Sequence, residues 1–353
     1  MRKLLSPRNI VIALAVLGVM LASAILVRIP LPVIVLPAEP VIYLGNIKLT
    51  NTFVATLIAD LTVIVLAVLA TRKMRDVPQG LQNLAEWFVE AFYNLSEDVA
   101  GKANVKKFFP IFMTILLFLL FCNWWGLIPG ADSIGRLEPL EYAFQAAGVT
   151  TGYKKIEGPL GVALLSARAG SYTLSAEEQA KLKEEKAKKA EKAEAEHGAK
   201  KEDAHHESEL GYYVIAPYLR PAATDLNLGL ALALISVFWT QVVGVRALGG
   251  GYFRKFFLPS MTGMKLIDLI VGLLELVSEF AKIISFTFRL FGNIFAGMVL
   301  LFVMSFLIPF LVPLPFYMLE LFVGFMQAFV FAILTLIFMT MATVSHEHGE
   351  EHH

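Results

Sequence analysis

Long apolar runs separated by short charged segments make up most of this chain. Four runs of about 20 residues are typical of helices that cross a membrane, and they lie at residues 9–27, 52–70, 108–128 and 226–245. Two longer segments follow, Lys265–Leu307 and residues 315–344. As helices, both exceed the roughly 30 Å thickness of the hydrocarbon core. We therefore expect them to be strongly tilted, or folded as a hairpin at the prolines between them.

Charged residues beside these runs predict the orientation of the helices. Basic residues are enriched on the cytoplasmic side of membrane proteins, and here they precede the first run and follow the second, as Arg72, Lys73 and Arg75. The first run, residues 9–27, fits a retained anchor or a cleaved signal peptide, and we favour the anchor. Residues 79–100 place apolar positions at helical spacing with acidic ones opposite, which predicts an amphipathic helix at the membrane interface.

A polar insert at residues 132–217 interrupts the apolar pattern. Its residues 176–209 are almost entirely Ala, Lys, Glu and His, which leaves too few apolar side chains to build a core. This segment is predicted to be a solvated helix or a disordered arm. His197, His205 and His206 lie near acidic residues and suit a metal ion, but a solvated face is the favoured interpretation and we expect no metal site.

Composition narrows the class of protein further. Of the 353 residues, 57% are hydrophobic, and the mean hydropathy of +0.65 is too high for a soluble α/β protein. Lys plus Arg and Asp plus Glu each total 30, so net charge gives no reason to expect a nucleic-acid partner. The single cysteine, Cys122, excludes an intramolecular disulfide. The chain has no GxxxxGK[ST] loop, so we expect neither phosphoryl chemistry nor a bound cofactor.

The most informative residue is Arg289, which lies within an apolar helical run. At the bilayer centre an arginine costs roughly 2.5 to 17 kcal/mol, so it normally faces protein or water. At about 100° per residue, the other polar residues of this helix fall near the same direction: Asp268, Glu275, Ser278, Glu279, Lys282, Ser285 and Asn293. The pattern predicts one polar seam along an apolar helix.

The last apolar segment carries a matching polar face. Glu320 and Gln327 are seven residues apart, with Gly324 between them, so a hairpin would bring this face beside Arg289. Arginine keeps its proton in proteins, so Arg289 can attract a carboxylate and block passage but cannot relay protons. Carboxyl groups such as Glu275 and Glu320 can exchange protons with water. The chemistry predicted is ion movement through two wetted regions separated by a fixed positive charge.

A simpler interpretation stays open at this point. Glu275, Glu279, Lys282 and Arg289 can instead form internal salt bridges, since Glu279 and Lys282 are three residues apart. In lipid, such an ion pair contributes little more to stability than packed leucine side chains would. This disfavours a purely structural role.

Three segments resemble subunit a of the membrane sector of F-type ATP synthases. They are RLFGNIFAG at residues 289–297, FMQAFVFAILTLIFM at residues 325–339 and PAATDLNLGLALAL at residues 221–234. The resemblance extends over about residues 45–130 and 217–345. The first two segments together are highly specific, whereas a lone arginine would not be.

The resemblance implies rotary proton translocation against a ring of c subunits, each with one membrane-embedded carboxyl group. Arg289 would meet each carboxyl group and stop protons leaking between two half-channels. Asn293 and Gln327 would support this arginine, and Glu275 and Glu320 would line the half-channel open to the outside. At the mouth of that channel the resemblance implies two polar residues, Asp225 and Asn227.

Three departures from the family pattern stand out. Met298 lies where members often have Glu or His, which makes Glu320 the main expected proton carrier in that half-channel. The insert at residues 132–209 has no counterpart in the usual pattern, and the apolar run at residues 9–27 is also extra.

We therefore predict an all-α polytopic membrane protein with about four transmembrane helices and a long, tilted C-terminal hairpin facing a rotor ring. The predicted parts are an anchor with an external segment, two spans with an interfacial helix, the charged external insert, the ion-translocating domain and a polar tail, at residues 1–50, 51–130, 131–217, 218–345 and 346–353. The expected partners are the c-subunit ring, the peripheral stalk b subunits, the remainder of the synthase and the lipid bilayer. The expected location is a bacterial cell inner membrane, and no enzymatic activity is expected of this chain itself.

Two alternatives remain at the level of sequence. An ion-coupled secondary transporter would use the same charged seam, but transporters usually show an internal repeat and broken helices, and Lys265–Leu307 contains no proline. A purely structural membrane subunit would tolerate neutral substitutions in the seam.

Overall fold

The computed structural model describes residues 18, 38–44, 47–157, 163–195, 208, 210–253, 256, 265–308 and 312–344. Three predictions fall largely outside these residues: the first apolar run, the polar tail and the three histidines of the insert. The chain divides into two compact units. The helical unit falls within residues 52–127, 221–296 and 320–353, and the insert unit falls within residues 1–51, 128–220 and 297–319.

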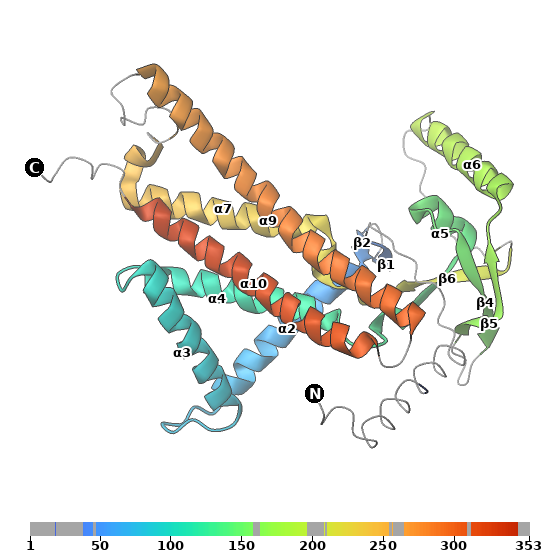
Figure 1. Cartoon of the computed structure of the whole chain (residues 1–353), viewed down its shortest axis with the longest axis horizontal. Coiled ribbons are helices and arrows are strands. Elements are labelled where there is room, and N and C mark those ends of the chain that lie inside the picture. Colours follow the sequence, from blue (N-terminus) through green and yellow to red (C-terminus); the bar gives the residue numbers. More distant parts are fainter. Residues whose placement is uncertain are drawn as a thin grey trace, which may run out of the picture. The chain divides into compact units, whose positions relative to one another are not determined.

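Within the described residues, five helices are long and apolar enough to cross a membrane (Figure 1). They are α2 (Asn51–Thr71), α4 (Val105–Trp125), α7 (Leu226–Leu248) with the following turn η4 (Gly249–Phe253), α9 (Lys265–Leu307) and α10 (Pro313–Thr343). These bounds agree with the predicted runs to within a few residues. The chain is mainly helical with several membrane-spanning candidates, so the predicted fold class is confirmed.

The helix α3 (Leu81–Ala100) is amphipathic, as predicted. Its Phe92 ring lies 6.0 Å from the rings of both Phe112 and Phe329, whereas Trp87 on the other side is 64% exposed. The position of α3 at a membrane interface stays a prediction.

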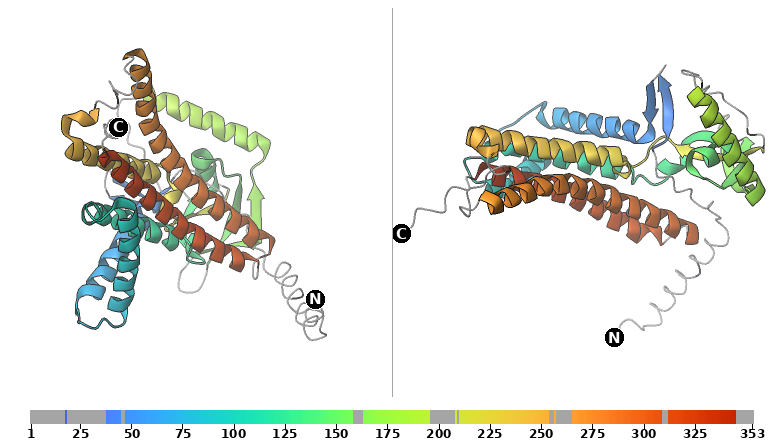
Figure 2. Two further views of the ribbon diagram at one scale, coloured as in Figure 1. Left: turned by 60° about the vertical axis from the view of Figure 1, so that its left-hand side comes forward. Right: turned by 90° about the horizontal axis from the view of Figure 1, so that it is seen from above.

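The two longest helices form an antiparallel pair in the helical unit, visible side by side in both views of Figure 2. Lys282 of α9 lies over the ring of Phe338 of α10, 4.6 Å from its centroid. Further toward the C-terminal end of α9, Asn293 meets Gln327 in the earlier part of α10. The residue numbers of the contacts rise along α9 while they fall along α10, so the two helices run antiparallel as a hairpin.

The core of the helical unit joins α4, α9 and α10. Its members are fully or almost fully buried, and they include Phe112, Leu116, Leu119, Phe286, Leu290, Ile294, Phe331 and Leu336. The rings of Phe286 and Phe331 stack with centroids 4.6 Å apart. On α9 these buried residues recur every four positions, so one stripe of the helix packs inward and leaves other faces available.

Helix α7 packs against the same core through small residues. A Cβ atom at Gly229 would lie 3.2 Å from the backbone oxygen of Thr287 in α9, so α7 and α9 approach closely. Further along α7, the hydroxyl groups of Ser236 and Thr335 share a buried hydrogen bond of 2.8 Å. This combination of small residues and polar contacts is typical of helix packing in membranes.

The insert unit contains strands that the sequence pattern does not predict. β1 (Pro40–Leu44) and β2 (Ile47–Thr50) form an antiparallel hairpin. A second, four-stranded sheet has the order β3-β6-β4-β5, formed by Gly135–Pro139, Tyr212–Pro217, Thr151–Glu157 and Ala163–Thr173. Its small core includes Leu140 and Phe144 of α5 (Leu140–Ala147) together with Val214 of β6. In β4 and β5, apolar residues are mixed with Lys, Arg, Ser, Thr and Gly, so the apolar alternation of these two strands is weak.

The charged segment of the insert begins with the helix α6 (Ala176–Ala195), which matches the solvated-helix prediction over those residues. Its start is a capping box. The backbone N–H of Ser175 donates to Glu178 Oε2 at 2.8 Å, and the N–H of Glu178 donates to Ser175 Oγ at 3.3 Å. This reciprocal pair satisfies two backbone donors that a helix start leaves open.

Substitution of Gly244 tests the packing at the end of α7. A Cβ atom at Gly244 would overlap the ring of Tyr252, which is 2% exposed. The gain in helix propensity from Gly244→Ala, about 0.5–1 kcal/mol, should be outweighed by an overpacking cost of about 1–3 kcal/mol. We expect a lower thermal unfolding midpoint for the purified protein in detergent. The matched control is Gly251→Ala, where an added Cβ meets nothing within 4 Å; equal midpoints for the two variants would contradict the packing.

Candidate functional site

The guanidinium of Arg289 lies at the rim of the packed core. Its Nη2 donates a hydrogen bond of 3.3 Å to Ser285 Oγ, one turn earlier on α9. Its central carbon lies 5.9 Å from the ring centroid of Phe286. Among the residues that the structure describes, no carboxylate lies within the 4.0 Å of an ion pair with Arg289. An arginine has five N–H donors, so most of its hydrogen-bonding capacity is available to a group outside this chain.

The face of α9 that carries Arg289 is lined by small residues and is open. Ser285, Asn293 and Ala296 are exposed, and a Cβ atom added at Gly292 would meet nothing within 4 Å. Small side chains allow another helix to approach closely. The opposite stripe of α9 is packed in the core, so the charge is held at a surface where a second helix can reach it.

Asn293 and Gln327 meet as the sequence pattern predicts. Asn293 Nδ2 donates to Gln327 Oε1 at 2.8 Å, one turn beyond Arg289 along α9. Gln327 is 5% exposed and its Nε2 has no hydrogen-bond partner within the described part of the chain. The pair fixes the two helices of the hairpin relative to each other beside the arginine.

Glu320 is buried on the same face of α10. It is 5% exposed, and its Oε1 has no hydrogen-bond partner among the described residues. The turn that carries it is held by α4, because Asn123 Nδ2 donates to the backbone oxygen of Gly324 at 3.0 Å and Trp124 Nε1 donates to that of Leu321 at 3.1 Å. A buried carboxyl group with an unused oxygen is suited to binding a proton or a water molecule.

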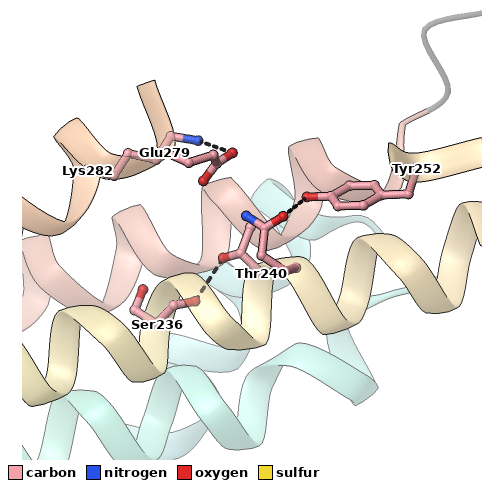
Figure 3. A network of polar contacts seen from close by, with 6 residues as sticks. Ser236, Thr240, Tyr252, Glu279 and Lys282 are labelled. Atoms are coloured by element: carbon pink, nitrogen blue, oxygen red, sulfur yellow. Dashed lines mark hydrogen bonds and ion pairs between the residues drawn. The ribbon is translucent and has the colours of Figure 1, made fainter. Parts of the chain in front are cut away.

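Glu279 and Lys282 form the internal ion pair that the simpler interpretation predicts. Lys282 Nζ lies 2.9 Å from Glu279 Oε1, and the two side chains are 21% and 9% exposed. Figure 3 shows this pair near a polar group on α7 and η4. There the hydroxyl of Tyr252 donates to Gln241 Oε1 at 2.7 Å. Glu279 is therefore engaged by Lys282, and Arg289 is not its partner.

Glu275 and Glu320 lie on opposite sides of Arg289 along the hairpin. It is fourteen residues before Arg289, or about 21 Å along the helix at 1.5 Å per residue. Glu275 is close enough to Tyr252 for the two to interact electrostatically. Glu320 precedes Gln327, and because the hairpin is antiparallel it lies toward the opposite end of α9. The two carboxyl groups therefore lie at different positions along the hairpin axis, and the half-channel that each one lines stays a prediction.

Asp225 has a structural role at the start of α7. Its Oδ1 accepts the backbone N–H of Asn227 at 2.9 Å, which caps the helix. Its Oδ2 accepts the hydroxyl of Thr52 at 3.1 Å. The side chain of Asn227 is exposed. Both residues lie at one end of α7, and their position at a channel mouth stays a prediction.

Several polar contacts near the site were not predicted. Asn123 is the clearest example, because an amide inside an apolar run is a visible signal in the sequence. The Ser236–Thr335 bond links α7 to α10, and Thr240 Oγ1 donates to the backbone oxygen of Ser236 at 2.9 Å (Figure 3). Met298, where the family often has an ionisable residue, is 7% exposed. In the part of the chain that the structure describes, no group of His, Cys, Asp and Glu side chains is placed to hold a metal ion.

Comparison with known protein families identifies the family of this chain. The family model described as ATP synthase A chain matches residues 53–340. This chain belongs to the ATP synthase A chain family. Members are non-catalytic subunits of the proton-conducting membrane sector, Fo, so the predicted class, with its role in ATP synthesis and proton transport, is confirmed.

Curated ATP synthase subunit a proteins from several bacteria cover most of the chain. The protein from Campylobacter jejuni subsp. doylei is 28% identical over 285 residues, which span 80% of this chain and 86% of the relative. The protein from a Nitratiruptor species is 26% identical over 309 residues, spanning 86% and 96%. The protein from Helicobacter pylori strain Shi470 is 26% identical over 278 residues, spanning 79% and 83%. Each match spans more than four-fifths of the relative's own length.

A double-mutant cycle tests the Glu279–Lys282 pair in this ATP synthase A chain protein. Lys282→Met alone should lower stability by about 2–3 kcal/mol, because it leaves a buried carboxylate without its charged donor. Adding Glu279→Gln should recover part of this loss, giving a coupling energy of about 0.5–3 kcal/mol. Thermal or denaturant unfolding of the purified variants measures it. Strictly additive losses would contradict the pair.

Proposed function

We propose that this chain is the stator-side proton channel of an F-type ATP synthase, with Arg289 as the charge that separates two half-channels. The observation that carries the proposal is a permanent cation on an open, small-residue face of a helix whose other side is packed in the core. A charge held this way costs free energy in an apolar membrane. A passing carboxylate from another subunit would compensate that cost.

The chemistry assigned to Arg289 is electrostatic. A rotor carboxyl group that approaches the guanidinium is favoured in its charged form, so it releases its proton before passing. The arginine itself keeps its proton, and a fixed positive charge repels protons that would otherwise cross directly. Asn293 and Gln327 hold the two helices at this level, which keeps the guanidinium at a constant distance from a passing helix.

We assign the half-channels from the positions of the carboxyl groups along the hairpin. Glu320, buried near the start of α10, belongs to the half-channel open to the outside, with Asp225 and Asn227 toward its mouth. Glu275 and Glu279 belong to the half-channel open to the cytoplasm, together with Lys282. This assignment follows the predicted orientation, in which α9 starts on the cytoplasmic side, and it differs from the shared half-channel that the family resemblance implies.

The energy source and partners follow from this role. One charge that crosses 100 mV releases about 2.3 kcal/mol, so several protons are required for each ATP and a ring of many carboxyl groups suits the task. We propose a c-subunit ring, peripheral stalk b subunits and the remainder of the synthase as partners, in a bacterial inner membrane. An ion-coupled secondary transporter fits less well, because α9 continues unbroken over 43 residues whereas transporter sites are usually formed by broken helices.

Replacement of Arg289 tests the separating charge. Arg289→Ala should abolish ATP-driven proton pumping in membrane vesicles, because the rotor carboxyl group loses the cation that discharges it, while the complex still assembles. Acidification of the vesicle interior, followed by a pH-sensitive dye, measures this. The matched control is Arg246→Ala, an exposed arginine in the last turn of α7, which should pump normally. Undiminished pumping by the Arg289 variant would reject the role.

The ranking of the carboxyl groups gives a second test. Glu320→Gln should slow proton pumping by about tenfold or more, as expected when a proton-exchanging group is lost. Glu279→Gln should slow it less, because Glu279 is already paired with Lys282. Initial pumping rates at matched enzyme amounts measure the difference. Equal rates in the two variants would count against Glu320 as the main carrier.

A further inference from the structure

A second cation lies near Arg289 on the same helix. Lys282 of α9 is seven residues before Arg289. The two side chains are therefore about 20° apart in direction and roughly 10.5 Å apart along the helix axis. Between them Ser285 is exposed, and it accepts the hydrogen bond from Arg289. Without a partner, Lys282 would be a second positive charge close to the open face that carries Arg289.

Two contacts hold the ammonium group of Lys282. Its Nζ lies 2.9 Å from Oε1 of Glu279, three residues earlier on α9. The same Nζ lies 4.6 Å from the ring centroid of Phe338 on α10, and this ring packs against the buried core. The Lys282 side chain is 21% exposed, and that of Glu279 is 9% exposed. The positive charge is thus held between a carboxylate and an aromatic ring of the neighbouring helix.

Two further titratable groups lie near this ion pair in the helical unit. Glu275 is one turn before Glu279 on α9 and is half-buried. Tyr252 of η4 lies close enough to Glu279 to interact with it electrostatically (Figure 3). From α10 the contact is Phe338, which carries no charge. The ion pair is neutral as a whole, so Glu275 carries the remaining ionisable carboxyl group at this level of α9.

Stability alone does not explain a charged pair at this position. A carboxylate and an ammonium group that leave water lose their hydration, so a buried ion pair stabilises a protein little more than packed apolar side chains do. The pair does, however, keep this part of α9 polar without adding net charge. That combination suits a wetted half-channel in which a passing carboxyl group must respond to one cation, Arg289.

We propose that Glu279 is a specificity-determining residue of proton translocation: by neutralising Lys282, it leaves Arg289 as the cation that holds a rotor carboxyl group ionised. Without Glu279, the ammonium group of Lys282 would favour the ionised form of that carboxyl group after it had left Arg289. Reloading it with a proton from the inner half-channel would then require a lower pH. This inference rests on the proposed function, in which Lys282 lies beside the inner half-channel.

The pH dependence of ATP-driven pumping tests this role. In inverted membrane vesicles the medium bathes the cytoplasmic side, from which the rotor carboxyl group takes its proton. Glu279→Gln should pump about threefold more slowly than the unmodified complex at medium pH 8 but equally fast at pH 6, because abundant protons reload the carboxyl group even beside a second cation. Rates are normalised to the amount of assembled complex. The matched control is Glu90→Gln, an exposed carboxyl group of α3, which should leave the pH profile unchanged.

A Lys282→Gln background separates neutralisation from other roles of Glu279. This background has no ammonium group to neutralise, so adding Glu279→Gln to it should leave the ratio of the rates at pH 8 and pH 6 unchanged. Equal slowing at both pH values would assign Glu279 a structural role, and equal slowing in both backgrounds would make it a proton carrier. Either result, or no slowing by Glu279→Gln at pH 8, overturns the proposal.

Failure of this inference is distinguishable from failure of the proposed function. Pumping that survives Arg289→Ala rejects the separating charge itself. A pH profile that Glu279→Gln leaves unchanged, in a complex that Arg289→Ala inactivates, overturns only the neutralisation of Lys282.

Discussion

The rest of the structure depends on one positive charge that an apolar helix must keep. Arg289 cannot be neutralised by losing its proton, and within the described residues its hydrogen bond goes to Ser285 and not to a carboxylate. Its helix therefore needs a packed side to hold it and an open side through which a compensating charge can come. The buried stripe through Phe286 and Leu290 provides the first, and the small residues around Gly292 provide the second.

Polar contacts between helices fix how far each helix is shifted along its axis relative to Arg289. Asn293 contacts Gln327 beside the arginine, and Ser236 of α7 contacts Thr335 of α10. Asn123 donates a hydrogen bond to the turn that carries Glu320. Hydrogen bonds between membrane helices average only about 0.6 kcal/mol, so together they add little to stability. Because each requires a particular register, their effect is to fix where Glu320 and Arg289 lie along the hairpin. The unused polar atoms of Glu320 and Gln327 then remain at defined positions for water and protons.

Much of this arrangement could be predicted from the sequence, because apolar length and helical spacing are local properties. The bounds of α9, Lys265–Leu307, follow from an apolar run without proline, and the common face of Glu320 and Gln327 follows from a spacing of seven. The level of Glu275 could not be predicted from its face alone, since direction along the hairpin depends on tertiary contacts. The sheet of the insert was missed because β4 and β5 mix apolar residues with Lys, Arg, Ser, Thr and Gly, and because the sheet buries only a small core. The cap formed by Asp225 could have been found, since Asp before an apolar run is a helix-start signal.

Cysteine cross-linking within the assembled complex tests most directly whether the open face of α9 meets a rotor. The single native cysteine, Cys122, is buried, so a new thiol at Ala296, on the arginine face, can be addressed selectively. We predict that Ala296→Cys cross-links to a cysteine placed beside the membrane carboxyl group of the c subunit, whereas Phe53→Cys on α2 does not. Absence of a cross-link from Ala296→Cys, with the complex intact, would contradict an arginine that faces the rotor.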